Sequence, residues 1–203
     1  MKARRVNPFK PAFRCLGIAE SFKKGRDKSI LAGIVMRRDL IIDGFIFTSV
    51  TIGGDDATNK IIEMYSRLKR DDINVIMING CIISWFNMIN VDKIYQNTGI
   101  PTICITYEPS PGIEKYLKKY FDEETAQKKI EEYKSLGERV KIYVKRANKY
   151  IYIRSAGIDP KVTKEVINAF IHNGIMPEPL RVAQGLARAM LNFINSVNIK
   201  EFY

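Results

Sequence analysis

One apolar run constrains the fold of this 203-residue chain more than any other feature. Residues Ile73–Ile78 read INVIMI, so apolar side chains occupy both alternating sets of positions. A strand with this pattern is expected at the centre of a parallel sheet, because helices then cover both of its faces. Parallel neighbours also need long crossover connections, which are usually helical. The run therefore predicts an α/β protein.

Three strand-like stretches precede this run and add a different kind of pairing. Phe13–Ala19 and Ser29–Met36 have the composition of buried strands, and a third such stretch covers Leu40–Ile52. The connection Arg37-Arg38-Asp39 is so short that its two strands must form an antiparallel hairpin. Asp43-Gly44 predicts a bulge or kink within the third strand.

The remaining elements alternate between helix and strand. Asp55-Asp56-Ala57-Thr58 has the chemistry of a helix N-cap and is followed by apolar residues at helical spacing. After INVIMI, the sequence predicts a short helix at 90–97, a strand at 102–106, helices at 112–120 and 122–135, a hairpin of 139–146 with 150–154, and helices at 160–171 and 178–195. This order predicts a ribonuclease H-like mixed sheet, with antiparallel hairpin strands beside parallel strands and helices on both faces. We expect a basic arm at residues 1–12 and a single domain at residues 13–203.

Composition narrows the class of protein. Hydrophobic residues make up 46% of the chain and charged residues 27%, and no apolar window is long enough to span a membrane or to form a signal peptide. A cytoplasmic protein is expected.

Cys15, Cys81 and Cys104 lack metal-site spacing and are expected to be buried free thiols. The single histidine, His172, excludes a His-rich metal site, and its position near a helix end favours a structural role over a catalytic triad.

The net charge of +11 is the main indication of a partner. A positive surface attracts phosphate backbones, so DNA or RNA is the expected partner. A lysine-rich thermophilic protein would have a similar composition for reasons of stability, and this explanation remains open.

Three stretches together resemble the endonuclease V family. They are LGIAES at 16–21, VIMINGCIIS with GIPTICIT at 75–84 and 99–106, and PEPLRVAQ at 177–184. The similarity is closer to archaeal relatives of unknown function described as endonuclease V-like, through GGDDAT, WFNMINVDKI and MPEPLRVAQGLARAM. The resemblance implies a ribonuclease H-like fold and a nuclease site in which carboxylates bind Mg²⁺ or Mn²⁺.

Carried over to this chain, the resemblance names four site positions. Glu20 and Asp56, with Asp55 as the alternative to Asp56, are the candidate catalytic residues and metal ligands. Asn79 stands where the family has an acid, and Gln184 stands where it has a histidine. The family's lysine is also absent, since Thr106-Tyr107-Glu108 occupies its place, and its lesion-inserting wedge has no counterpart. The resemblance thus implies weak binding of Mg²⁺ or Mn²⁺ and a nuclease activity that is lost or very weak.

Basic residues near this predicted site could still hold nucleic acid. The candidates are Lys23, Lys24, Arg26, Lys28 and Arg181. Phe22, Trp85 and Phe86 could stack on bases, although packing under a helix is the simpler explanation for Trp85 and Phe86. Three functions follow: a nucleic-acid-binding protein with an eroded site, an active endonuclease using Glu20 and Asp56, and a protein-interaction scaffold.

Overall fold

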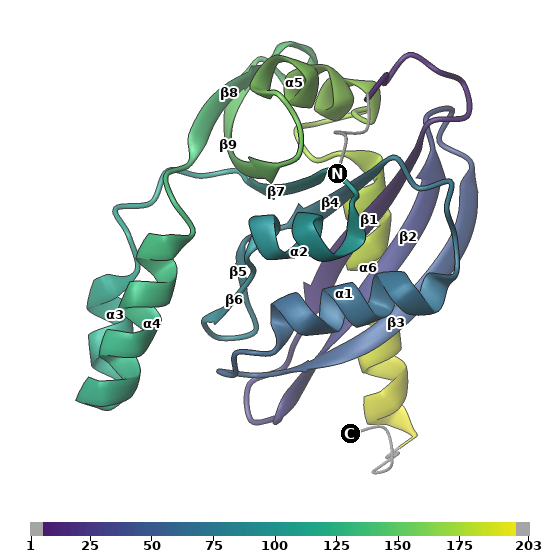
Figure 1. The fold of residues 1–203 in the computed structure, drawn as a ribbon. Helices are drawn as coiled ribbons and strands as arrows, with labels where there is room; N and C mark the ends of the chain where they lie inside the picture. Colours follow the sequence, from purple (N-terminus) through teal and green to yellow (C-terminus); the bar gives the residue numbers. More distant parts are fainter. Residues whose placement is uncertain (1–5, 198–203) are drawn as a thin grey trace.

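The computed structural model describes residues 6–197 and is built around a seven-stranded mixed sheet (Figure 1). The strand order is β3-β2-β1-β4-β7-β9-β8. β1, β4 and β7 are parallel, whereas β2 and β3 on one side and β9 and β8 on the other pair antiparallel. The strands are β1 (Arg14–Ser21), β2 (Lys28–Arg37), β3 (Ile42–Thr51), β4 (Val75–Asn79), β7 (Thr102–Thr106), β8 (Val140–Val144) and β9 (Lys149–Ala156). The predicted mixed sheet and the central position of the INVIMI strand are confirmed.

Helices cover both faces of this sheet, as predicted (Figure 1). One face packs against α1 (Ala57–Leu68) and α2 (Val91–Thr98), and the other against α5 (Pro160–Ala169) and α6 (Glu178–Ser196). α3 (Glu114–Tyr120) and α4 (Glu123–Ser135) form a helical hairpin beside the sheet, and a 3₁₀ turn (Lys145–Ala147) joins β8 to β9. Among the described residues, no helix is both long and apolar enough to cross a membrane.

The side chains of β1 separate the two cores. Leu16 and Ile18 pack in the core under α1 and α2, whereas Cys15 and Ala19 pack in the core under α6. Between them, Gly17 lets the first turn of α6 approach the strand, because a Cβ at this position would lie 2.5 Å from Cβ of Pro179. The PEPLR turn is therefore seated directly on the middle of β1.

The predicted bulge in β3 is also confirmed. The β2–β3 register passes from Val35 opposite Gly44 to Met36 opposite Ile42, which leaves Asp43 as the extra residue.

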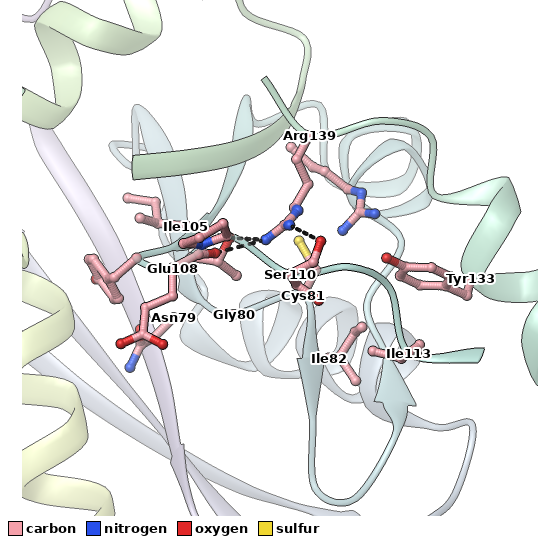
Figure 2. A pocket seen from close by; sticks show the side chains of 14 residues that line it. Asn79, Gly80, Cys81, Ile82, Ile105, Glu108, Ser110, Ile113, Tyr133 and Arg139 are labelled. Atoms are coloured by element: carbon pink, nitrogen blue, oxygen red, sulfur yellow. Dashed lines mark hydrogen bonds between the residues drawn. The ribbon is translucent and has the colours of Figure 1, made fainter. Parts of the chain in front are cut away.

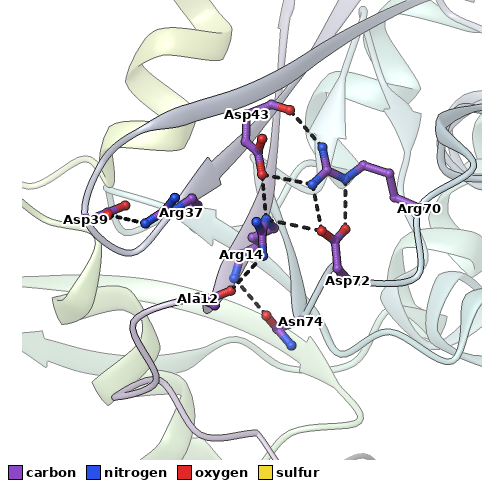
Figure 3. Close-up of polar contacts among 8 residues, drawn as sticks. All are labelled: Ala12, Arg14, Arg37, Asp39, Asp43, Arg70, Asp72 and Asn74. Carbon is purple, nitrogen blue, oxygen red and sulfur yellow. Dashed lines mark hydrogen bonds and ion pairs between the residues drawn. The ribbon is translucent and has the colours of Figure 1, made fainter.

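At the bulge, the side chain of Asp43 forms part of an ion-pair network (Figure 3). Its carboxylate accepts hydrogen bonds from Arg14 Nε at 2.6 Å and Arg70 Nη2 at 2.9 Å, and Arg70 also binds both carboxylate oxygens of Asp72. Hydrogen bonds from Arg14 and Arg70 lower the pKa of Asp43, and the bond from Arg70 lowers that of Asp72. The network joins β1, β3 and the segment between α1 and β4.

Some smaller features agree with the expectations and others do not. The sequence patterns did not indicate the short hairpin of β5 (Ile82–Ile83) and β6 (Asn87–Met88). His172 lies exposed beyond the end of α5. The first five residues of the predicted basic arm lie outside the described residues, and Val6 packs against the core under α6. Cys15, Cys81 and Cys104 are buried free thiols, as predicted.

Candidate functional site

Glu20, the first candidate ligand, is bound to the protein itself. Glu20 follows Ala19 on β1, so its side chain extends on the face covered by α1 and α2. Its Oε1 accepts the backbone N–H of Ser84 at 2.8 Å and its Oε2 accepts the Ser84 hydroxyl at 2.6 Å. Ser84 Oγ also lies 2.5 Å from Ser29 Oγ, so the bonds form a chain from β2 to β1. This carboxylate ties the end of β1 to the β5–β6 hairpin.

The turn of that hairpin, residues 84–86, has an unusual backbone. Ser84, Trp85 and Phe86 have φ values of 44°, 58° and 69°, a left-handed conformation that non-glycine residues rarely adopt in succession. The Ser84 carbonyl accepts the N–H of Gly53 at 2.7 Å, which adds a further restraint. This backbone conformation is energetically unfavourable, so it persists only because the surrounding structure holds it in place.

Asp56, the second candidate, is bound from the other side of the same turn. Both of its oxygens accept the Thr51 N–H, at 3.0 and 3.2 Å, and further bonds come from Thr51 Oγ1 at 2.9 Å and Asn87 Nδ2 at 2.7 Å. Burial by itself would raise the pKa of Asp56, but these hydrogen bonds outweigh burial and lower it.

Asn87 supplies the helix cap that the sequence assigned to an aspartate. Asp56 occupies the N-cap position of α1, but its side chain makes no capping bond. The N–H of Ala57 is instead accepted by Asn87 Oδ1 at 3.0 Å, while Asn87 Nδ2 also donates to the carbonyl of Thr51 at 2.9 Å. A polar residue from a distant hairpin thus caps the helix, and no local pattern indicates this.

Asp55, the alternative to Asp56, faces α4. Its carboxylate lies 2.6 Å from Nζ of Lys129, whose side chain is only 3% exposed. The same ammonium donates to the carbonyl of Gly54 at 3.1 Å. Asp55 therefore fastens the start of α1 to the α3–α4 hairpin.

Asn79 and Gln184 belong to the opposite face of the sheet. Ile18 lies opposite Ile78 in the parallel β1–β4 pair, so Ala19 and Asn79 are the next neighbours, on the side of α6. Gln184 is half-buried on α6. The structure thus brings Glu20 and Asp56 to two ends of one turn, but it does not bring them together with Asn79 and Gln184. The residue of β1 next to Asn79 on this face is Ala19, which has no ligand atom in its side chain.

These residues do not fit the pair of divalent ions that the resemblance implied. The carboxylates of Glu20 and Asp56 accept hydrogen bonds from protein donors, and Asn79 offers only a neutral amide. Within residues 6–197, no three His, Cys, Asp or Glu side chains gather where they could hold a metal ion. A two-metal mechanism needs several carboxylates that converge on the ions.

The candidate basic residues lie in two places, one in and just after the loop between β1 and β2 and the other on α6. The basic loop, residues 22–27 between β1 and β2, exposes Lys23 and Lys24, and Lys28 follows it at the start of β2. Arg26 hydrogen-bonds Asn195 near the end of α6. Arg181 forms an ion pair with the buried carboxylate of Glu178 on α6.

Aromatic side chains gather between the turn of the β5–β6 hairpin and the end of α3. Trp85 is 37% exposed and makes edge contacts with Tyr120 of α3, at a centroid distance of 4.9 Å, and with Phe86, at 5.7 Å. The ring of Phe86 in turn makes an edge contact with the ring of Phe121. Trp85 therefore packs beside a helix, as the simpler explanation expects, yet keeps part of its ring in solvent.

A cavity of about 480 Å³ opens at the carboxyl ends of β4 and β7 (Figure 2). Asn79, Cys81, Glu108, Arg139 and Arg154 are among its lining residues. Sequence reasoning missed the two arginines, because they lie far along the chain on and beside the β8–β9 hairpin and only the antiparallel pairing of β9 with β7 brings them here.

Comparisons with known proteins agree with this fold. The family model described as endonuclease dU matches residues 11–191. A UPF0215 protein from Pyrobaculum calidifontis is 35% identical over 181 residues, which cover 89% of this chain and 98% of the relative. A second UPF0215 protein, from Methanopyrus kandleri, is 30% identical over 92% of this chain and 94% of its own length.

Solved structures give the same result. A protein of unknown function from Archaeoglobus fulgidus has a TM-score of 0.72 and 30% identity, with 88% of this chain and 98% of that chain covered. Endonuclease V of Ciona intestinalis, crystallised with inosine-containing DNA, has a TM-score of 0.60 at 13% identity, over 90% of this chain and 87% of that one, and this likeness concerns the fold alone. The endonuclease V-like resemblance is confirmed, and the chain belongs to the endonuclease dU family.

Proposed function

We propose that this protein binds nucleic acid and has lost, or nearly lost, the metal-dependent cleavage expected of an endonuclease V-like fold. The observation that carries the proposal is the commitment of both candidate carboxylates to protein hydrogen bonds. Glu20 is held by Ser84, and Asp56 by Thr51 and Asn87. Carboxylates held in this way stabilise the β5–β6 hairpin and its turn, and displacing their donors would add a cost to any metal binding.

The binding surface that we propose combines charge with exposed rings. Ser84 contacts Glu20 near the end of β1 and Ser29 near the start of β2, the two strands that the basic loop joins, so the loop and Trp85 lie at the same end of these strands. Lys23 and Lys24 can neutralise phosphates, and Trp85 can stack on an unpaired base. Such a surface favours single strands without strong sequence preference.

A binding and cleavage experiment tests the proposal. Wild-type protein is mixed with end-labelled single-stranded and duplex DNA and RNA, including inosine-containing and dU-containing strands, in the presence of Mg²⁺, Mn²⁺ or EDTA. We expect a shifted, intact band whose intensity falls steeply with salt. On single strands, each lost phosphate contact should reduce the slope of log K against log salt by about 0.7.

The matched variants separate the basic loop from general charge. Lys23→Gln/Lys24→Gln should weaken binding and reduce the salt slope, whereas Lys161→Gln/Lys164→Gln on α5, with the same loss of charge, should not. Equal effects of the two double variants would exclude the basic loop as the binding surface. Metal-dependent products that disappear in Glu20→Gln would instead establish the active endonuclease. Absence of binding to every DNA and RNA strand at low salt would favour the interaction scaffold.

A further inference from the structure

We propose that the cavity at the carboxyl ends of β4 and β7 binds a phosphomonoester group between the guanidinium groups of Arg139 and Arg154 (Figure 2). The ligand is a free phosphate or mononucleotide, or the terminal phosphate of a nucleic acid strand. The site does not involve the basic loop, so the proposal goes beyond general nucleic-acid binding and can fail or succeed independently of it.

Arg154 is a buried cation that lines the cavity beside the Cys81 thiol. Its side chain is 7% exposed, its Nε donates to the carbonyl of Gly137 at 3.0 Å, and its guanidinium lies 5.6 Å from the ring centre of Tyr133. Within the part of the chain that the structure describes, no carboxylate forms an ion pair with it. Burying an unpaired charge is costly, so an anion in the cavity would offset this cost.

Arg139 is held at the same cavity by neutral acceptors. Its Nη1 donates to Thr106 Oγ1 and to the carbonyl of Glu108, both at 3.2 Å, and its Nη2 donates to the carbonyl of Ser110 at 3.2 Å. Figure 2 shows the guanidinium bound to the end of β7 and to the segment that follows it. The contacts fix the orientation of the guanidinium plane but leave its charge unneutralised. Such a group is preorganised for an anion.

The charge and size of the cavity select a phosphomonoester. Such a group carries about −1.5 to −2 charges at neutral pH, whereas an internal phosphodiester carries only one, so two guanidinium groups match the monoester. The volume of about 480 Å³ falls within the range of roughly 300–1,000 Å³ that is usual for small-molecule sites. Glu108 is the one carboxylate that lines the cavity, and its charge should reduce the affinity.

Calorimetric titration tests the site directly. Inorganic phosphate and a nucleoside 5′-monophosphate are titrated into the full chain, with the parent nucleoside as the uncharged comparison. We expect both phosphates to bind and the nucleoside not to bind. Arg139→Gln and Arg154→Gln should each weaken binding about tenfold or more, since each removes a charge-assisted hydrogen-bond donor. Glu108→Gln should tighten binding.

The control is Arg188→Gln, an equal loss of charge at an exposed position of α6 away from the cavity. Its affinity should equal that of the wild type. Arg139 is only half-buried, so Arg139→Gln keeps the test decisive if Arg154→Gln fails to fold. Absence of phosphate binding at millimolar concentrations, or unchanged affinity in Arg139→Gln, would overturn the proposal.

Oligonucleotides then identify the source of the phosphate. Strands of one sequence carry a 5′-phosphate, a 3′-phosphate or no terminal phosphate. Preference for a phosphorylated end, lost in Arg139→Gln, assigns the cavity to strand ends. Equal binding of all three strands, with mononucleotide binding retained, assigns it to free nucleotides. If no strand binds and the mononucleotide does, the general nucleic-acid function fails and the phosphate site stands.

Discussion

Ala19 and Asn79 are neighbours on parallel strands and face the same side of the sheet, toward α6, whereas Glu20 faces the other side and binds Ser84. A ligand on β1 that could share a metal ion with position 79 would therefore have to stand at position 19. Adjacent strands are separated by about 4.8 Å, which is close enough for two carboxylates to share one ion.

Introducing carboxylates at these two positions should create a divalent cation site. The double variant Ala19→Asp/Asn79→Asp should unfold at a higher temperature in Mn²⁺ than in EDTA, because a ligand present at about 100 times its Kd stabilises the native state by about 2.7 kcal/mol. The wild type and the single variant Asn79→Asp should show no such difference. A rise in the single variant equal to that of the double variant would assign the new ligand to another side chain.

The Ser84 hydroxyl should contribute measurably to stability. Ser84→Ala removes one of the two donors to the Glu20 carboxylate and the neighbour of Ser29 Oγ. We expect a loss of about 1–3 kcal/mol in urea unfolding, since the polar groups left behind are partly or wholly buried. Ser135→Ala, at the exposed end of α4, is the control and should cost much less. Similar losses in both variants would show that the Glu20–Ser84 contact has little weight.

Asn87 should couple stability to pH through Asp56. Asn87→Ala removes the cap of α1 and a donor to Asp56, and should cost about 2–4 kcal/mol near neutral pH. The lowered pKa of Asp56 means that its stabilising contribution is present above its unfolded-state pKa, near 4, and is lost as the pH falls through the lower folded-state value.

Because Asn87→Ala raises the pKa of Asp56, the difference in unfolding free energy between wild type and variant should narrow toward acidic pH. Urea unfolding over a series of pH values measures this difference. Asn97→Ala, an exposed position on α2, should leave the pH profile unchanged. A difference that stays constant with pH would disprove the coupling to Asp56.

Cys81 should be the most reactive thiol of the three. The neighbouring Cys104 thiol lowers the pKa of Cys81 most strongly, and the positive charges of Arg154 and Arg139 lower it further, against the opposing effect of burial. Burial raises the pKa of Cys15 and of Cys104. Cys81 also lines the cavity, which gives the reagent a route to its thiol. Alkylation by iodoacetamide, mapped by mass spectrometry, should therefore occur first at Cys81, with a midpoint at lower pH than those of Cys15 and Cys104.

Arg154→Gln should move that midpoint to higher pH, because the variant loses the nearby positive charge. Arg188→Gln again serves as the control. An unchanged midpoint in Arg154→Gln would show that this charge does not act on the thiol.

Local patterns predicted most of the framework. Strand periodicity and tight turns depend on residues close together in the sequence. Local patterns therefore predicted the INVIMI strand, the short Arg37-Arg38-Asp39 turn and the bulge at Asp43. The β5–β6 hairpin was missed because its two strands are only two residues long, which is too short for any alternation to be recognised.

The site depended on relationships that no local pattern contains. The sequence by itself determined the order of strands and helices, the neutral amides at positions 79 and 184, and the positive charge. Only the tertiary structure decided that Glu20 and Asn79 face opposite sides of the sheet, since that follows from the register of β1 against β4. It also brought Asn87 to the start of α1 and Arg154 to the cavity, because hydrogen bonds between distant segments and strand pairing across the sheet place these side chains.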